Sequence, residues 1–144
     1  MNVLKVDYSS TFNKLKVICF SNFDVFINNK SVYFTCQKSK EMLAYLVHRR
    51  GLWCTITELC EILFGEYCDL SKKEKQVKNI LNALKKTLKI INAEDVLIRE
   101  KNNIAVDINK IDCDYYKFLK SYPKPSVIYT GEYMENYKWA QFSR

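Results

Sequence analysis

Lysines and asparagines recur along residues 71–91, where they alternate with aliphatic side chains. A lysine ammonium can bind a phosphate oxygen, and an asparagine amide can pair with the edge of an adenine base. The polar side chains of this stretch are Lys75, Lys78, Asn79, Asn82, Lys85, Lys86 and Lys89. Contact with a nucleic acid is therefore the chemistry that these residue types could perform.

The aliphatic residues of the same stretch predict how the polar ones are positioned. Their intervals of three and four place them on one face of a helix with about 3.6 residues per turn. They are Val77, Ile80, Leu81, Leu84 and Leu88. The polar set falls on the opposite face, and the S-x-x-E spacing of Ser71 and Glu74 predicts a capping box at the helix start. A surface helix that carries lysines only for solubility would show the same pattern.

Length and charge narrow the class of protein. A chain of 144 residues suits a single domain with a sizeable core. A net charge of +7 favours polyanionic partners, although the charge is spread along the chain. The sequence contains neither a run of 18 apolar residues nor a basic-then-apolar leader, so we expect no membrane partner and a cytoplasmic protein.

Six cysteines could suggest disulfides or a metal site, but their spacing favours neither. The chain has no C-x-x-C pair and a single histidine, and the thiols lie within apolar periodic segments. Reduced cysteine behaves there as a small apolar residue, so we expect buried free thiols and no metal. The residues concerned are Cys19, Cys36, Cys54, Cys60, Cys68 and Cys113.

Residues for catalysis are not indicated. Three glycines form no phosphate-binding loop, and no serine or cysteine has a histidine partner in a motif, so we expect no enzyme, no catalytic residue and no cofactor. His48 lies beside Arg49 and Arg50 at an expected helix end, where a positive charge suits the helix dipole. We interpret His48 as structural.

The remaining segments predict the elements around the 71–91 helix. Three β-rich runs, 16–20, 24–28 and 31–35, predict an antiparallel meander. Helices are expected at 38–50 and, after a link at 52–54, at 55–64, where Thr55 and Glu58 have capping-box spacing.

Two further β-like runs, 96–100 and 104–108, are joined by the polar tip 101–103 and predict a hairpin. A sheet, three helices and a hairpin in this order form an α+β winged helix-turn-helix, whose last helix would enter the major groove with the hairpin as its wing.

The chain is expected to divide into three parts. Residues 1–14 are a flexible N-terminal segment, 15–108 the winged-helix domain, and 109–144 a short helical, aromatic-rich extension. The aromatic residues of that extension are too many to remain in water, so they fold back onto the domain or pack on another chain or domain. They are Tyr115, Tyr116, Phe118, Tyr129, Tyr133, Tyr137, Trp139 and Phe142.

Several runs resemble one known family over residues 16–142. QVKNILNALKKTL resembles the recognition helix of OmpR/PhoB-type winged-helix DNA-binding domains. ICFSNFDVFINNKSVYF resembles the N-terminal sheet of the response regulators and antibiotic-pathway activators in which a helical activation domain follows the winged helix. SKEMLAYLVHRRG and TITELCEILF are similar to the first two helices of that subgroup. IDCDYYKFL and YTGEYMENYKWAQF resemble the opening of the activation domain.

The resemblance implies roles for particular residues. Lys78, Asn79 and Asn82 would face base edges or the groove floor. Phosphates would be bound by Lys75, Lys85, Lys86 and Lys89, and the adjacent minor groove or backbone by Arg99, Lys101 and Asn102 of the wing. The loop 65–70 occupies the position that contacts RNA polymerase in OmpR-like activators, and the family suggests a homodimer on tandem half-sites.

The resemblance implies a DNA-binding transcription regulator, or the DNA-binding domain of a two-component response regulator, acting on double-stranded DNA. The alternative is a winged-helix protein–protein interaction module that has lost specific DNA readout and binds through its aromatic tail. This alternative is motivated by Lys85 and Lys86, which stand where the family has arginines, because lysine is the poorer bidentate reader of guanine. Single-stranded RNA binding ranks last, because the polar face of the 71–91 helix lacks aromatic residues.

Overall fold

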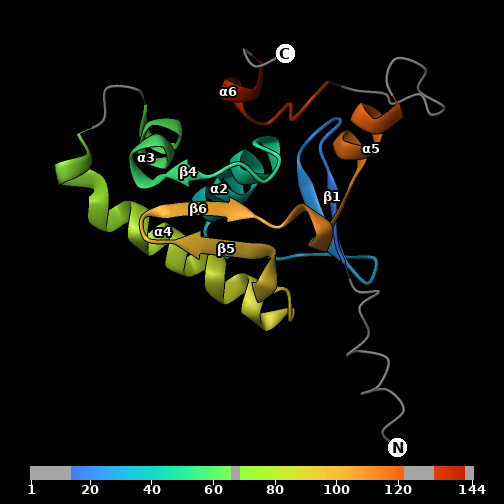
Figure 1. Cartoon of the computed structure of the whole chain (residues 1–144), viewed down its shortest axis with the longest axis horizontal. Coiled ribbons are helices and arrows are strands. Elements are labelled where there is room, and N and C mark those ends of the chain that lie inside the picture. The colour runs from blue at the N-terminus through green and yellow to red at the C-terminus, as the bar shows by residue number, and fades with distance from the viewer. Residues whose placement is uncertain (1–13, 66–68, 122–131, 142–144) are drawn as a thin grey trace, which may run out of the picture.

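The computed structural model describes residues 14–65, 69–121 and 132–141. Figure 1 shows a small sheet flanked by a group of helices, with a hairpin lying along the longest helix. The strands are β1 (Leu15–Ile18), β2 (Asp24–Ile27), β3 (Lys30–Ser31), β4 (Cys54–Thr55), β5 (Leu97–Glu100), β6 (Asn103–Val106) and β7 (Ile111–Cys113). The α-helices are α2 (Gln37–His48), α3 (Ile56–Phe64), α4 (Leu70–Ile90), α5 (Asp114–Ser121) and α6 (Lys138–Gln141). The two short 3-10 helices of the described residues are η1 (Glu94–Val96) and η2 (Ile108–Lys110).

The first sheet has the strand order β3-β2-β1-β7. β1 and β2 pair antiparallel as the sequence predicts, with Val17 opposite Val25. The third expected strand is shorter than predicted, because β3 covers only residues 30–31. Val32 and Phe34 are buried and Tyr33 is exposed, so the alternation continues although the backbone leaves the sheet. β7 was not predicted; it pairs parallel with β1, with Cys113 opposite Val17.

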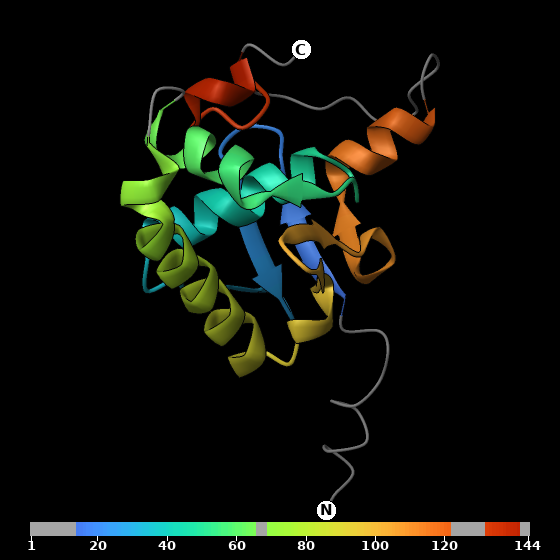
Figure 2. The same ribbon diagram turned by 60° about the vertical axis from the view of Figure 1, so that its left-hand side comes forward.

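Three helices enclose the core beside this sheet. α4 buries the predicted aliphatic stripe together with Thr87, and Leu84 and Leu88 are fully shielded from solvent. α2 buries the continuous run Met42–Val47. It ends at His48, two residues earlier than predicted, because Arg50 and Gly51 adopt positive φ and turn the chain toward β4. α4 packs against both α2 and α3, as Figure 2 shows.

The start of α4 differs from the predicted capping box. Asp69 is the N-cap residue: its carboxylate accepts hydrogen bonds from the Ser71 amide at 3.0 Å and from the Ser71 hydroxyl at 2.7 Å. The Ser71 hydroxyl is thus a donor to Asp69, and Glu74 pairs with Lys78, so neither residue caps the helix. The capping prediction for Ser71 and Glu74 was wrong because an aspartate two residues earlier competes for the same role.

The capping box predicted at the start of α3 is confirmed for one of its two contacts. The Thr55 hydroxyl accepts from the Glu58 amide at 3.0 Å, as an N-cap does. The Glu58 carboxylate does not return to the cap; it accepts a hydrogen bond from the Tyr45 hydroxyl of α2.

The second sheet has the order β4-β6-β5, and its β5–β6 hairpin is the predicted wing. The turn is tighter than predicted, because Asn103 already belongs to β6 and Lys101 takes the positive φ of 57°. Val96 and Ile108, expected at the strand ends, belong to η1 and η2. β4, expected as part of a link, pairs with β6 and joins the wing to the start of α3.

The C-terminal segment 132–141 packs on the domain. The amide of Met134 donates to the carbonyl of Cys19 at 2.6 Å, and Tyr133 forms an isolated bridge with Phe20. The prediction that the aromatics fold back is confirmed for the residues that contact the core, whereas Tyr129 and Phe142 lie outside the described residues. The contacting residues are Tyr115, Tyr116, Tyr133, Tyr137 and Trp139.

Two side-chain predictions need correction. Cys60 is disulfide-bonded, not a free thiol, whereas Cys19, Cys36, Cys54 and Cys113 are free and Cys68 lies outside the described residues. His48 does not act as a cation at the end of α2, because burial, followed by the charges of Arg50 and Arg49, lowers its pKa. Instead, Nδ1 of His48 lies 2.7 Å from the Tyr133 hydroxyl.

Candidate nucleic-acid interface

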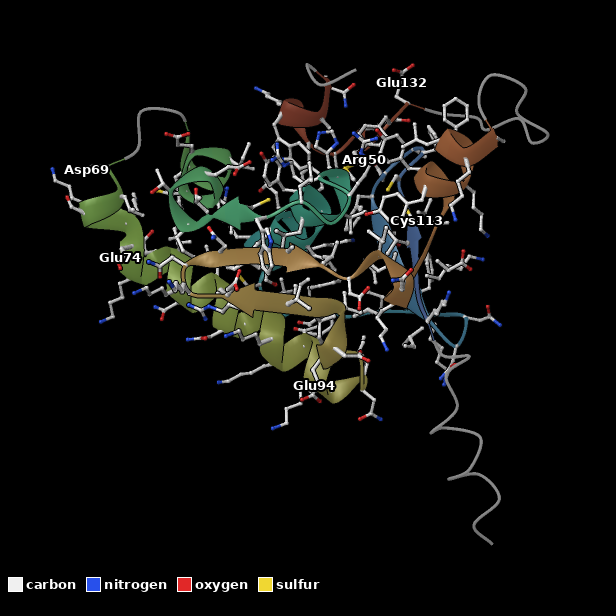
Figure 3. All side chains as sticks on the ribbon, viewed as in Figure 1. Arg50, Asp69, Glu74, Glu94, Cys113 and Glu132 are labelled. Atoms are coloured by element: carbon white, nitrogen blue, oxygen red, sulfur yellow. The ribbon has the colours of Figure 1, made fainter. Side chains whose placement is uncertain are left out.

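The outer face of α4 carries every residue that was predicted to contact nucleic acid from this helix. All seven side chains are exposed, while the aliphatic stripe behind them is buried. Figure 3 shows nitrogen-tipped side chains projecting from the outer side of α4, in the stretch between the labelled Asp69 and Glu94. The exposed residues are Lys75, Lys78, Asn79, Asn82, Lys85, Lys86 and Lys89.

This face is strongly positive, but one of its lysines is paired with a carboxylate. α4 contains seven lysines and one acidic residue, Glu74. The carboxylate of Glu74 lies 2.8 Å from Nζ of Lys78, one turn later. Within the described parts of the chain, no carboxylate pairs with Lys75, Lys85, Lys86 or Lys89. These four ammonium groups are therefore available to an anionic partner, and Lys78 is shared with Glu74.

Of the three predicted wing residues, one lies beside α4 and two lie at the hairpin turn. Arg99, Lys101 and Asn102 are all exposed, and Nε of Arg99 donates to the Lys101 carbonyl at 3.3 Å. A groove of about 230 Å³ runs between α4 and β5. Lys85, Lys89 and Arg99 line it together, with Glu94 as the acidic member. The structure thus brings those three cations together, whereas Lys101 and Asn102 stand at the hairpin turn and do not line the groove.

The angle between α2 and α3 is held by a partly buried polar contact. The Tyr45 hydroxyl donates to Glu58, and Nη1 of Arg49 lies 3.7 Å from the same carboxylate. Burial, and then the hydrogen bond to Glu58, raises the pKa of Tyr45, so this hydroxyl remains a neutral donor. The contact joins the last turns of α2 to the first turn of α3, the helix that precedes α4.

Two lysines from neighbouring helices lie over the ring of Phe64 at the end of α3. Nζ of Lys73 from α4 and Nζ of Lys38 from α2 lie 5.0 and 5.5 Å from the centre of the Phe64 ring. Lys38 also donates to the Leu63 carbonyl at 2.6 Å, at the negative end of α3. Lys73 therefore helps to hold the start of α4 against the end of α3. Lys72, which is exposed in the first turn of α4, was missed although it belongs to the same lysine run.

A cluster of metal-binding residue types occurs away from this face. The sulfurs of Cys19 and Cys113 lie 3.6 Å apart beside Asp114. The Asp114 carboxylate already accepts the amides of Cys19, Phe20 and Tyr115 at 2.7, 3.2 and 2.7 Å. The hydrogen bond with Cys113, together with burial, raises the pKa of the Cys19 thiol. The cluster is best explained as a link between β1 and the start of α5.

Comparison with known proteins identifies the fold. No protein-family model and no curated protein matches the chain. Among solved structures, it is similar to EmbR of Mycobacterium tuberculosis, determined in complex with a low-affinity phosphopeptide, with a TM-score of 0.63 and 20% sequence identity. The match covers 75% of this chain and 29% of the EmbR chain, so this chain spans less than a third of that protein. The expected α+β winged-helix fold is confirmed. In the described part of the chain, no helix is both long and apolar enough to cross a bilayer.

Proposed function

We propose that the protein is a DNA-binding transcription regulator in which α4 enters the major groove and the β5–β6 hairpin contacts the neighbouring minor groove or backbone. The observation that carries the proposal is the division of α4 into a fully buried aliphatic stripe and an exposed face of lysines and asparagines beside the wing. The major groove admits an α-helix, and the 21 residues of α4 extend for about 30 Å.

Two asparagines at the centre of the exposed face are proposed to read bases. With about 100° of rotation per residue, Lys75, Asn79, Asn82 and Lys86 point most directly away from the buried stripe. An asparagine amide matches the N6 and N7 positions of adenine, so Asn79 and Asn82 would supply sequence preference. Lys78 would reach base edges or the groove floor when it leaves Glu74.

Four lysines of this face and three residues of the wing are proposed to bind phosphates. Lys75, Lys85, Lys86 and Lys89 form the helix part of this set, and Arg99, Lys101 and Asn102 the wing part. The groove between α4 and β5 supports the assignment of Lys85, Lys89 and Arg99, because three cations facing one concavity would hold a single phosphate strand. Such contacts fix the position of the duplex without reading its sequence.

Finer assignments extend this proposal. The resemblance to the OmpR/PhoB-type subgroup suggests a response regulator or antibiotic-pathway activator, with 109–144 as the start of a helical activation domain after a winged-helix domain at 15–108. It also suggests a homodimer on tandem half-sites, and we further propose a cytoplasmic location. The proposed RNA polymerase contact uses loop 65–70, of which residues 66–68 lie outside the described residues.

A protein-interaction module is the second candidate. The aromatic tail supports it less than expected, because Tyr133 is only 4% exposed and packs on the domain. A different surface supports it: Tyr33 and Ile90 are exposed by 80% and 81% beside a groove of about 650 Å³ between the β2–β3 hairpin and the end of α4. Exposed apolar residues around a groove are typical of protein contacts.

Selection from a pool of random duplexes distinguishes the two candidates. The protein would be incubated with the pool at about 150 mM salt, and bound duplexes would be amplified and sequenced over several rounds. Enrichment of a common half-site that Asn79→Ala and Asn82→Ala relax supports sequence-specific DNA binding. Retention of the pool without enrichment at any position would contradict the role of the asparagines and favour the interaction module.

A further inference from the structure

A second cationic pocket lies away from α4. It has a volume of about 530 Å³ and is enclosed by the start of β1, the turn after α2, the η2–β7 segment and α5. In Figure 3, Arg50 is labelled at the end of α2 and Cys113 at the end of β7, two elements that border the pocket. None of the residues proposed to contact DNA lines it.

Three cations that line this pocket have no acidic partner among the described residues. Lys14 precedes β1, Arg50 follows α2 and Lys120 belongs to α5, and none of them forms a salt bridge within the described parts of the chain. The one acidic residue of the lining, Asp112, lies 2.8 Å from Nζ of Lys117 and is neutralised by it. Three positive charges facing one concavity favour a ligand with more than one negative charge.

The remaining walls are apolar. Ile111 is buried at the base, while Leu119 and the 45% exposed Ile108 offer further apolar surface. The Tyr116 hydroxyl donates to the Val47 carbonyl of α2, which fixes the ring in the wall. Apolar walls with a few convergent charges, in a volume between about 300 and 1,000 Å³, are typical of small-molecule sites.

The rim of the pocket is rigid on the side of Arg50. Arg50 has a positive φ of 56°, and its amide donates to the Val47 carbonyl at 3.0 Å. Gly51 follows with φ of 88°, and an added Cβ there would lie 3.2 Å from Cγ2 of Ile108. This close approach holds the Arg50 turn against η2, so the guanidinium is presented by a fixed backbone.

From these observations we infer that the pocket binds a small organic dianion, such as a phosphate monoester, that carries an apolar group. The phosphate would lie among Lys14, Arg50 and Lys120, where the Arg50 guanidinium can donate two parallel hydrogen bonds to its oxygens. The apolar group would lie against Ile108, Ile111 and Leu119. The inference does not depend on DNA binding, because it uses a different surface.

Phenyl phosphate is a suitable probe for this site. Titration of the ¹⁵N-labelled chain, followed by its amide resonances, reports both the affinity and the location. We expect shifts centred on residues 50, 108–113 and 117–120, with tighter binding of phenyl phosphate than of inorganic phosphate or benzoate. Equal affinity for phenyl phosphate and inorganic phosphate would contradict the apolar subsite, and shifts centred on α4 would contradict the location.

Charge-matched variants test the cations. Arg50→Gln with Lys120→Gln should weaken phenyl phosphate binding about tenfold, whereas Lys85→Gln with Lys86→Gln should leave it unchanged. All four side chains are exposed, so thermal unfolding of the variants should match the parent chain. An equal loss of affinity in both double variants would show that phenyl phosphate is held by general charge attraction and not by this pocket. Loss of duplex DNA binding by the first pair, without phenyl phosphate binding by the parent chain, would assign the pocket to a nucleic acid and overturn the inference.

Discussion

Nζ of Lys78 lies 2.8 Å from Oε2 of Glu74, and both side chains belong to the exposed face of α4. Glutamate four residues before lysine is the favourable order for a helical ion pair, so the contact stabilises α4 by about 0.2–0.5 kcal/mol. The same carboxylate stands on the face proposed to meet phosphates, where a negative charge opposes binding. Helix stability and DNA affinity therefore make opposite demands on Glu74.

Replacing Glu74 with glutamine should strengthen duplex DNA binding about three- to tenfold at low salt, because one repulsive charge is removed and Lys78 is released. The gain should shrink as salt is added. Fluorescence anisotropy with a labelled duplex measures the affinity. The matched control is Asp112→Asn, which breaks the exposed 2.8 Å pair with Lys117 far from α4 and should leave DNA affinity unchanged. Unchanged or weaker binding by Glu74→Gln would contradict the placement of Glu74 on the DNA-contacting face.

The N-cap of α4 can be tested by comparing two alanine variants. Asp69→Ala removes the acceptor of the Ser71 amide and should lower the free energy of unfolding by about 1 kcal/mol. Ser71→Ala removes only a hydroxyl that donates to Asp69, and it should cost less than about 0.5 kcal/mol. Urea unfolding gives both values, and a larger loss for Ser71→Ala would restore the capping box that the sequence suggested.

His48 should make stability depend on pH below neutrality. Burial, and then Arg50 and Arg49, lowers the pKa of His48 in the folded protein relative to the unfolded chain. Between the two pKa values the unfolded state binds more protons, so stability is lost as the pH falls below the unfolded value of about 6.5. His48→Gln should reduce the loss of urea midpoint between about pH 7.5 and about pH 5.5. An identical loss in both proteins would show that carboxylates alone cause it.

The hydroxyl of Tyr45 should contribute measurably to the stability of the fold. Tyr45→Phe removes the donor to Glu58 and should destabilise the protein by about 1–2 kcal/mol, because the partly buried carboxylate loses a partner. Tyr33→Phe is the control, since Tyr33 is 80% exposed and its hydroxyl change should be nearly silent. Equal urea midpoints for the two variants would show that the hydrogen bond between Tyr45 and Glu58 does not stabilise the protein.

Local periodicity was enough to predict the helices and the wing. Val77, Leu81 and Leu88 recur at helical spacing because one side of α4 meets a core, and the fold buries them as expected. The polar tip at Lys101 and Asn102 indicated the hairpin for an equally local reason. The exposed lysines and asparagines of α4 follow from the same helical geometry.

The pairing of strands that are far apart in the sequence could not be predicted from local patterns. β7 pairs with β1 across more than 90 residues, and the three residues Ile111–Cys113 carry no signal for a parallel partner. β4 has only two residues, and its pairing with β6 depends on the turn at Arg50 and Gly51. The contact between His48 and Tyr133 likewise joins residues that are 85 positions apart. Such contacts require the tertiary structure, because neither partner is local in sequence.

The salt dependence of duplex binding shows whether α4 is the helix that contacts DNA. Anisotropy titrations at several salt concentrations should give a slope of log affinity against log salt of roughly −4 to −5 for about four to six phosphate contacts. Lys78→Ala with Lys85→Ala and Lys86→Ala should reduce that slope by about 2 to 3 and weaken binding at low salt. The control changes the exposed Lys16, Lys30 and Lys138 to alanine, an equal loss of charge away from α4, and should keep most of the slope. Equal reductions in the two triple variants, or no binding at low salt, would contradict α4 as the DNA-contacting helix.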